Sequence, residues 1–387
     1  PNAEFIELKN TGLETTINLS LVRFTEGIHF TFPSLELGPN EYVLVVKDQA
    51  LFDLRYPSVP LPPEKILGPY EGRLANGGEQ IRLEDAIGRT ILDFEYKDGW
   101  RPITDGDGFS LTIIKPTNDD PNSWGEKDSW RASNYVGGSP GDDTDILPNP
   151  GAVVINEVLA HSYNPASDWI ELYNTTNEPI DIGGWFLSDN DSNLMKYKIE
   201  DGMTIAPYDY LVFYEDVHFG DGSNPDIPFA FSANGEEAYL SSGLDQNGKL
   251  MGYREVEDFG ASETNVSFGR YFKSSTGNFN FVAMDSNTPG WGNAPPKVGP
   301  IVINEIMYHP QTEGDAEYVE LLNISGSTVT LQEWDNVQGI YVPWRFTDEG
   351  GITFDFPPGT TMDVGEKILL VKNLTVFEFE FGRDRTG

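Results

Sequence analysis

Short stretches in which apolar and polar residues alternate recur along the whole chain. In residues 168–174 (Asp-Trp-Ile-Glu-Leu-Tyr-Asn), Ile170 and Leu172 fall on one face of an extended segment, which is the period of a half-buried strand. Turns rich in Gly and Pro separate these stretches, and the only helical candidate is a turn or two over residues 48–56. The pattern predicts an all-β protein made of antiparallel, immunoglobulin-like β-sandwich modules with at most short helical turns.

Several of these stretches return at nearly fixed spacing. Residues 153–158 (Val-Val-Ile-Asn-Glu-Val) return as residues 301–306 (Ile-Val-Ile-Asn-Glu-Ile), 303 − 155 = 148 positions later. Residues 168–174 return as residues 317–323 and, near the start, as residues 4–10. A repeat of this kind indicates consecutive copies of one structural module.

The copies differ in how much of the module they contain. The first two share an Asn-Gly turn, at residues 76–77 and 234–235, and each closes on a Ser-Pro-Gly or Thr-Pro-Gly stop. The first has no counterpart of the Ile-Asn-Glu strand, and the third ends before any counterpart of the Asn-Gly strand. We therefore predict a module that lacks its first strand over residues 1–147, a complete module over residues 148–296, and a module truncated in its C-terminal half over residues 297–387. On this interpretation the chain is a piece of a longer array.

The charge balance narrows the choice of partners. The chain has 62 Asp and Glu against 25 Lys and Arg, which gives a net charge of −37. Such a surface repels nucleic acids and anionic membranes, whereas it attracts divalent cations and basic proteins. The chain has no cysteine, which excludes disulfides and thiolate metal sites. No apolar run is long enough to span a membrane, so we expect no membrane insertion.

The second copy carries an ordered set of motifs. Ile-Asn-Glu at residues 155–157 precedes Trp-Ile-Glu-Leu-Tyr-Asn at residues 169–174, then Ile-Gly-Gly-Trp-Phe-Leu-Ser-Asp at residues 182–189 and a turn at Pro207. This order resembles the lamin-tail domain. The resemblance implies an immunoglobulin-like sandwich that makes protein contacts, with bacterial relatives in large secreted multidomain proteins. Because Trp185 lies in the most complete copy, we predict that it is buried between the two sheets.

The other copies depart from this order at the tryptophan of the Gly-Gly-Trp motif. The first copy has Val22 where that tryptophan would fall, and the third has Gln-Glu-Trp ending at Trp334. Two further tracts, residues 105–111 and 129–133, are similar to bacterial versions of the domain. Together the copies cover nearly all of the chain.

One polar segment has the spacing of a calcium loop. Asp189, Asp191, Asn193 and Glu200 stand at its first, third, fifth and twelfth places. The sixth place is Leu194, where an EF-hand needs Gly, and no helices flank the segment, so a true EF-hand is excluded. The segment is either a looser calcium site in a β-loop, which would make calcium a ligand, or a polar hairpin turn. We predict no other cofactor.

Two features with the residue types of catalytic sites are interpreted as structural. Residues 137–141 (Gly-Gly-Ser-Pro-Gly) match the nucleophile elbow around Ser139, but a proline and an acidic stretch follow where the elbow needs a helix. The carboxylates of Glu7, Glu171 and Glu320 recur at one strand position in every copy, as do those of Glu157 and Glu305 at another. A catalytic pair is needed in one cleft only, so we expect these groups to accept hydrogen bonds from neighbouring loops.

The histidines are too few for a metal site of their own. The chain has 4, and two of them, His161 and His309, stand at equivalent places after the Ile-Asn-Glu strand. One histidine per module cannot hold a metal without carboxylate partners, so we expect structural or solvated side chains and no catalytic residue.

These observations predict a non-catalytic structural or adhesive array within a larger secreted or cell-surface protein, located outside the cell or at its surface. Its partners would be other proteins, or copies of itself, bound through sheet edges. A first alternative is a carbohydrate-binding accessory region of a secreted enzyme, which would bind glycans on exposed Trp100, Trp124 and Trp130. A second alternative is a segment of an enzyme whose site lies in unremarkable loops.

Overall fold

The structure is a computed structural model. It describes residues 3–118, 120–142, 144, 146–163, 165–220, 227–311, 314–335, 339–347 and 352–382. The chain forms two compact units, residues 1–295 and residues 296–387. Nearly all strand pairs are antiparallel, and the α-helices are α1 (Gln49–Arg55) and α2 (Leu374–Phe381), so the predicted all-β fold with short helical turns is confirmed. Among the described residues, no helix is long and apolar enough to cross a membrane.

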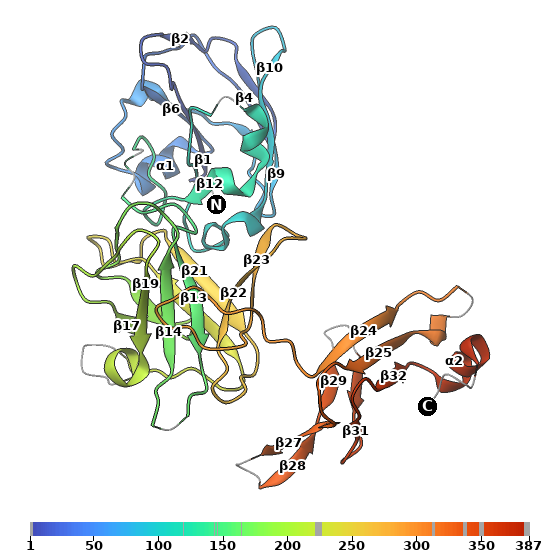
Figure 1. The fold of residues 1–387 in the computed structure, drawn as a ribbon. Helices are drawn as coiled ribbons and strands as arrows, with labels where there is room; N and C mark the ends of the chain where they lie inside the picture. The colour runs from blue at the N-terminus through green and yellow to red at the C-terminus, as the bar shows by residue number, and fades with distance from the viewer. Residues whose placement is uncertain are drawn as a thin grey trace. The chain divides into compact units, whose positions relative to one another are not determined.

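The most complete sandwich lies in the C-terminal half of the first unit (Figure 1). Its strands are β13 (Val153–Leu159), β14 (Trp169–Asn174), β15 (Ile180–Asp181), β16 (Phe186–Ser188), β17 (Tyr197–Lys198), β18 (Thr204–Ile205), β19 (Tyr210–Tyr214), β20 (Glu236–Ser241), β21 (Arg254–Phe259), β22 (Phe268–Lys273) and β23 (Asn278–Ala283). One sheet has the order β19-β14-β13-β22-β23 and the other the order β17-β16-β20-β21. A π-helical turn (Glu215–Phe219) follows β19.

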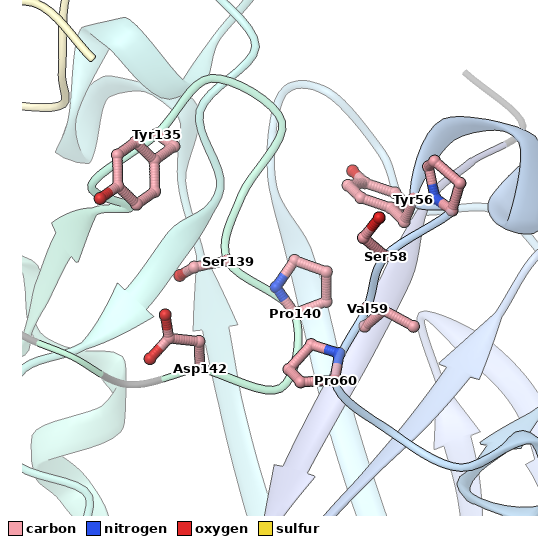
Figure 2. Close-up of a pocket in the computed structure, with 9 residues that line it drawn as sticks. Tyr56, Ser58, Val59, Pro60, Tyr135, Ser139, Pro140 and Asp142 are labelled. Atoms are coloured by element: carbon pink, nitrogen blue, oxygen red, sulfur yellow. The ribbon is translucent and has the colours of Figure 1, made fainter. Parts of the chain in front are cut away.

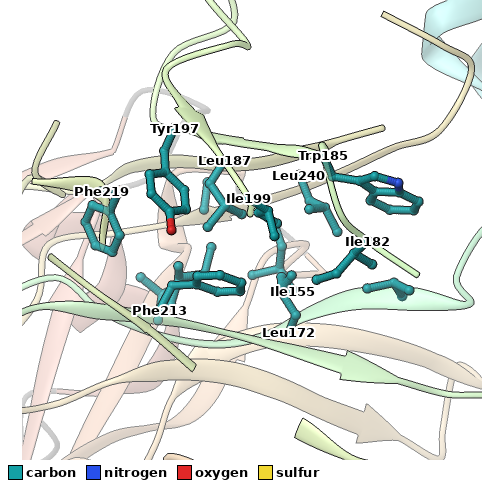
Figure 3. Packing of buried hydrophobic residues seen from close by; sticks show 14 of the residues in the cluster. Ile155, Leu172, Ile182, Trp185, Leu187, Tyr197, Ile199, Phe213, Phe219 and Leu240 are labelled. Carbon is teal, nitrogen blue, oxygen red and sulfur yellow. The ribbon is translucent and has the colours of Figure 1, made fainter. Parts of the chain in front are cut away.

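The core of this sandwich lies between its two sheets, as Figure 3 shows. Ile155 and Leu172 come from the first sheet, Leu187 and Leu240 from the second, and all four side chains are fully buried. Trp185 packs among them with 4% of its surface exposed. The prediction that Trp185 is buried between the sheets is therefore confirmed.

The N-terminal half of the first unit contains two larger sheets, with the orders β1-β6-β7 and β10-β9-β3-β4-β8, and the pairs β2-β5 and β11-β12. Its strands are β1 (Phe5–Lys9), β2 (Ile17–Asn18), β3 (Arg23–Glu26), β4 (Ile28–Thr31), β5 (Glu36–Leu37), β6 (Tyr42–Val46), β7 (Ile66–Leu67), β8 (Glu71–Gly72), β9 (Glu79–Glu84), β10 (Thr90–Tyr96), β11 (Leu111–Ile113) and β12 (Trp130–Ala132). Short 3-10 turns are Pro63–Lys65, Asp98–Trp100, Pro102–Thr104, Pro121–Gly125 and Lys127–Ser129. Helix α1 forms where residues 48–56 predicted one, because the Asp48 side chain caps it and Phe52 is buried beneath it.

The two halves of the first unit are joined by a close contact. The Gly252 N–H donates to the Asn134 carbonyl at 3.0 Å, and Arg254 Nη1 lies 2.7 Å from Asp107 Oδ2. A Cβ atom added at Gly252 would lie 1.8 Å from the Ser133 carbonyl oxygen, so the contact requires glycine there. The first two modules therefore pack as one body.

The second unit has the orders β24-β25-β32, β26-β31, β27-β28 and β29-β30. Its strands are β24 (Ile301–Met307), β25 (Tyr318–Asn323), β26 (Val329–Thr330), β27 (Gln332–Asp335), β28 (Ile340–Pro343), β29 (Arg345–Thr347), β30 (Thr353–Asp355), β31 (Thr361–Met362) and β32 (Lys367–Val371), and a 3-10 turn spans Gly314–Ala316. Helix α2 follows β32 as α1 follows β6, and the Asn373 side chain caps it. The repeat is thus visible in the structure as well as in the sequence.

The structure corrects one residue correspondence. In the second module, Trp185 donates its backbone N–H to the Ile182 carbonyl at 3.0 Å; in the second unit, Trp344 donates to the Leu331 carbonyl at 2.9 Å. Trp344 is therefore the counterpart of Trp185, and the assignment of that role to Trp334 was wrong.

The reason for the wrong assignment is an insertion. Val22 donates to the Leu19 carbonyl at 3.0 Å, so the first module keeps the same short spacing as the second and Val22 stands where it was expected. In the second unit, twelve residues (332–343) separate the two hydrogen-bonded positions, against two (183–184) in the second module, and the longer segment carries the paired strands β27 and β28. Trp334 belongs to this added hairpin.

Candidate interaction surfaces

Two recurrent carboxylates are deeply buried in the second module. Glu157 and Glu171 are cross-strand neighbours on β13 and β14, and each has 0% of its surface exposed. Glu157 accepts hydrogen bonds from the Thr288 N–H at 3.1 Å and the Thr288 hydroxyl at 2.6 Å. Glu171 accepts from the Gly290 N–H and, at 2.7 Å, from Asn156 Nδ2. The pair therefore holds the Thr-Pro-Gly turn against the sheet.

Burial dominates the electrostatics of this pair. Desolvation raises the pKa of Glu171 to about 7, although the Gly290 and Asn156 hydrogen bonds favour the charged form. Desolvation also raises the pKa of Glu157, against the donors Ser267 and Thr288. Both side chains are committed to groups of their own module, in line with the predicted structural role.

The counterparts of Glu171 meet different surroundings. Glu7 accepts the N–H of Gly141, the glycine of the Ser-Pro-Gly stop, at 2.5 Å. Glu320 instead accepts from Lys367 Nζ at 2.7 Å and from the Asn304 side chain, and Lys367 is the main cause of its lowered pKa. One sequence position thus holds a closing turn in two modules and an ion pair in the third.

Ser139 lies in a turn of the chain at a shallow pocket of about 240 Å³ (Figure 2). The Asp142 N–H donates to the Ser139 carbonyl at 3.0 Å, which closes the turn directly after the serine. The pocket is lined by Tyr56, Pro57, Ser58, Val59, Pro60, Tyr135, Ser139, Pro140 and Asp142. None of these residues is a histidine, and the turn is not the strand-to-helix elbow that would expose a nucleophile.

The two equivalent histidines differ in exposure. His161 is half-buried, with Nδ1 3.0 Å from the Ser262 carbonyl and Nε2 3.3 Å from the Thr264 hydroxyl, so it links two loops of its module. His309 is exposed. These are the structural and solvated environments that the sequence predicted.

The calcium-loop residues form a polar turn after β16. Asp189 forms an ion pair with Lys196, while Asp191 and Glu200 are exposed and Asn193 is half-buried. Within the described parts of the chain, no group of three or more His, Asp or Glu side chains is placed to hold a metal ion. Calcium binding stays a prediction, and an ion at this turn would have to displace Lys196 from Asp189.

The three tryptophans proposed for sugar binding pack on one another. Trp100 has 7% of its surface exposed, and Trp124 and Trp130 are half-buried. The Trp130 ring lies 5.4 Å from the Phe94 ring centroid, and its Nε1 donates to the Trp124 carbonyl at 2.8 Å. These rings are packed against one another and against Phe94, and they do not form the flat, exposed aromatic platform that a sugar ring would stack on.

The added hairpin β27–β28 carries an exposed aromatic pair. Trp334 and Tyr341 face each other across the hairpin, 5.0 Å apart between ring centroids, and they are 48% and 60% exposed. Ile340 and Val342 are also exposed on β28. The sequence carried a signal for this feature, because apolar residues cluster here in a stretch with no counterpart in the other copies. It was missed because Trp334 was aligned with the core tryptophan.

Comparison with known proteins identifies the repeated module. A family model described as the Lamin Tail Domain matches residues 147–255 and residues 294–380, which together make up half of the chain. No curated protein has a significant match. Lamin tail domains are immunoglobulin-like β-sandwiches that generally serve as protein-interaction modules and are generally non-catalytic. Both matched regions contain the Ile-Asn-Glu strand and the recurrent strand glutamate.

Proposed function

The chain belongs to the lamin tail domain family, and we propose that it is a non-catalytic structural or adhesive array within a larger secreted or cell-surface protein. Its modules would bind other proteins, or further copies of the same chain, outside the cell or at its surface. Two kinds of observation support this proposal: the family's general use in protein contacts, and the surfaces that the modules leave exposed.

The observation that carries the proposal is the added hairpin β27–β28. Its exposed Trp334 and Tyr341 contact each other edge to face, so they present a paired apolar surface to solvent. Aromatic side chains of this kind are typical anchors of protein interfaces, because they bury a large area at low conformational cost. Single apolar residues are common on protein surfaces and do not indicate a binding site. A cluster of exposed apolar residues on an inserted hairpin does indicate one.

Charge indicates which partner would fit. Glu333 and Asp335 flank Trp334 on β27, and the whole chain carries a net charge of −37. A partner surface that offers Arg or Lys beside apolar groups would match both the carboxylates and the aromatic rings. The firm contact between the first two modules at Gly252 suits an array that holds its binding surfaces at fixed spacing.

Site-specific photo-crosslinking tests this proposal. A photoreactive phenylalanine analogue replaces Tyr341 in the full chain, expressed in the cells that make the protein, and irradiation is followed by mass spectrometry of the adducts. We expect adducts to a small set of proteins, and none of these from the same analogue at Tyr163, which is equally exposed but lies outside the hairpin. Identical adducts from both positions, or none from Tyr341, would refute a protein contact at the hairpin. Adducts to polysaccharide would favour the carbohydrate-binding alternative.

A further inference from the structure

The outer face of the second module carries a pair of stacked tyrosines. Strands β14 and β19 lie side by side in its first sheet (Figure 1), and Tyr173 on β14 stands opposite Tyr210 on β19. Leu172 next to Tyr173 is buried in the core, so the alternation of a strand turns Tyr173 to the other face. The two rings are 4.6 Å apart between centroids and inclined by 25°, and both side chains are half-buried. They form an aromatic ledge on the side of the sheet that faces away from the core.

Trp291 extends this ledge from the closing turn of the module. The Trp291 N–H donates to the Thr288 carbonyl at 3.0 Å, and the N–H of the preceding Gly290 is bound by Glu171, which lies on the same face of β14 as Tyr173. The turn therefore holds Trp291 over the outer face, although 75% of the surface of this tryptophan is exposed. We call Tyr173, Tyr210 and Trp291 the aromatic row.

The aromatic row is open to a ligand. Trp291 stands between Gly290 and Gly292, and a Cβ atom added at Gly290 would meet nothing within 4 Å, so no flanking side chain covers the indole. The Tyr210 hydroxyl lies 3.5 Å from where a Cβ on Gly292 would be, which places this hydroxyl beside the tryptophan. Among the described residues, no group hydrogen-bonds to the indole N–H or to the hydroxyls of Tyr173 and Tyr210. Each ring of the row thus keeps a polar group for a ligand.

The first module shows that the fold does not require this row. Its residues at the three positions are Lys9, Tyr42 and Asp142, and Lys9 Nζ lies 5.1 Å from the centroid of the Tyr42 ring. The turn before Asp142 closes on the same backbone hydrogen bond as the turn before Trp291. The sheet and the turn therefore form with a lysine and an aspartate where the second module has Tyr173 and Trp291. An exposed tryptophan that its turn does not need, beside two further rings, indicates a binding surface.

We propose that the aromatic row binds an uncharged polysaccharide. One face of a sugar ring consists of C–H groups, which pack on the negative face of an aromatic ring, and its hydroxyls can bond with the tyrosine hydroxyls and the indole N–H. The net charge of −37 disfavours acidic polysaccharides. Trp291 between two glycines lacks the surrounding contacts that exclude water around a protein hot spot, which favours a sugar over a protein. This site goes beyond the proposed protein contacts and does not depend on the β27–β28 hairpin.

Calorimetric titration of the full chain with soluble oligosaccharides tests the site. The probes are four uncharged hexasaccharides, namely cellohexaose, xylohexaose, mannohexaose and laminarihexaose. We expect saturable binding of at least one of them, with one oligosaccharide per chain. Hexagalacturonate has a carboxylate on every sugar and should not bind, because the acidic chain repels it.

Variants of the chain locate the binding. Trp291→Ala should weaken it by about 10-fold or more, because a sugar loses its stacking partner, while the exposed position leaves the fold intact. Tyr210→Ala should weaken binding as well, and urea unfolding of this variant checks that the module is still folded. Trp334→Ala is the matched control: it removes an exposed tryptophan outside the row and should leave binding unchanged.

Three results would overturn the inference. The first is no saturable binding of any of the four hexasaccharides at millimolar concentration. The second is binding that Trp291→Ala leaves unchanged, since the sugar would then lie elsewhere. The third comes from the photoreactive phenylalanine analogue placed at Trp291 in the cells that make the protein: adducts to a protein and none to polysaccharide would make the row a protein contact. The Tyr341 crosslinks test the hairpin separately, so either proposal can fail without the other.

Discussion

Replacing Glu171 by Gln tests whether a buried carboxyl sets the pH dependence of the second module. Glu171 is fully buried, and desolvation raises its pKa from the ordinary 4.5 to about 7. The folded state therefore holds this proton more tightly than the unfolded state does. Its contribution to stability is complete below pH 4.5, falls as the pH rises from 4.5 to 7, and stays low above pH 7. Glutamine keeps an oxygen for the Gly290 N–H but has no proton to lose.

The pKa difference sets the magnitude. A pKa raised from 4.5 to about 7 corresponds to a loss of about 3 kcal/mol of folding free energy between pH 4.5 and pH 8. The glutamine amide introduced by Glu171→Gln would face the Asn156 amide, which must reorient at a cost of about 1 kcal/mol, the worth of one hydrogen bond. Because that cost does not depend on pH, the variant should lose about 3 kcal/mol less than the wild type between pH 4.5 and pH 8.

Urea unfolding of the full chain at several pH values between 4.5 and 8 measures this difference. Repulsion from the net charge of −37 also grows with pH, but it acts almost equally on both proteins and cancels in the comparison. Glu320→Gln is the matched control, because Lys367 lowers the pKa of Glu320, so its contribution is lost as the pH falls and not as it rises. Equal pH dependence of the wild type and Glu171→Gln would refute the reasoning.

Three further outcomes are expected. Trp185→Ala should cost about 3–5 kcal/mol in urea unfolding, since it empties the sandwich core, whereas Trp291→Ala at a 75% exposed site should cost less than about 0.5 kcal/mol. Gly252→Ala should separate the first two modules and speed proteolysis between them, and Gly260→Ala, whose added Cβ meets nothing within 4 Å, should not. Calcium at a hundredfold excess over Kd should add about 2.7 kcal/mol of stability and Asp191→Ala should remove that gain; identical melting in chelator and in millimolar calcium would exclude the site.

The sequence was sufficient for the fold because the signals for it are local. Alternation in residues 168–174, turns at Gly and Pro, and the cap at Asp48 all act within a few residues, and the strand and the helix that they predict are present. The repeat added long-range information, since a pattern that returns must bury the same face each time. On that basis Trp185 could be placed in the core.

The hairpin β27–β28 could not be predicted in the same way. A Gly-Gly-Trp motif places its tryptophan by spacing, and Trp334 has nearly the expected spacing while Trp344 does not. Only the hydrogen bond to Leu331 shows that Trp344 takes the core position. The insertion places Trp334 at the spacing that the motif predicts and shifts the core tryptophan to position 344. The local sequence pattern therefore matches the wrong residue.

The surroundings of the recurrent strand glutamate could not be predicted from its own strand, but a residue on the neighbouring strand indicates them. The strands around Glu171 and Glu320 are similar, yet the pKa is raised in the second module and lowered in the third. A turn covers the carboxylate of Glu171, whereas Lys367 pairs with that of Glu320. The covering turn lies far away in sequence and no local pattern reveals it. A neighbouring position does: the residue that opens the partner strand is Tyr42 or Tyr210 in the first two modules and Lys367 in the third.

Tyrosine stands at this position in the modules whose glutamate is covered by a turn. The Tyr210 hydroxyl lies close to the segment that follows the turn, because a Cβ atom added at Gly292 would be 3.5 Å from it. Lysine suits a site that no turn covers, because its ammonium group pairs with the Glu320 carboxylate in place of a backbone N–H.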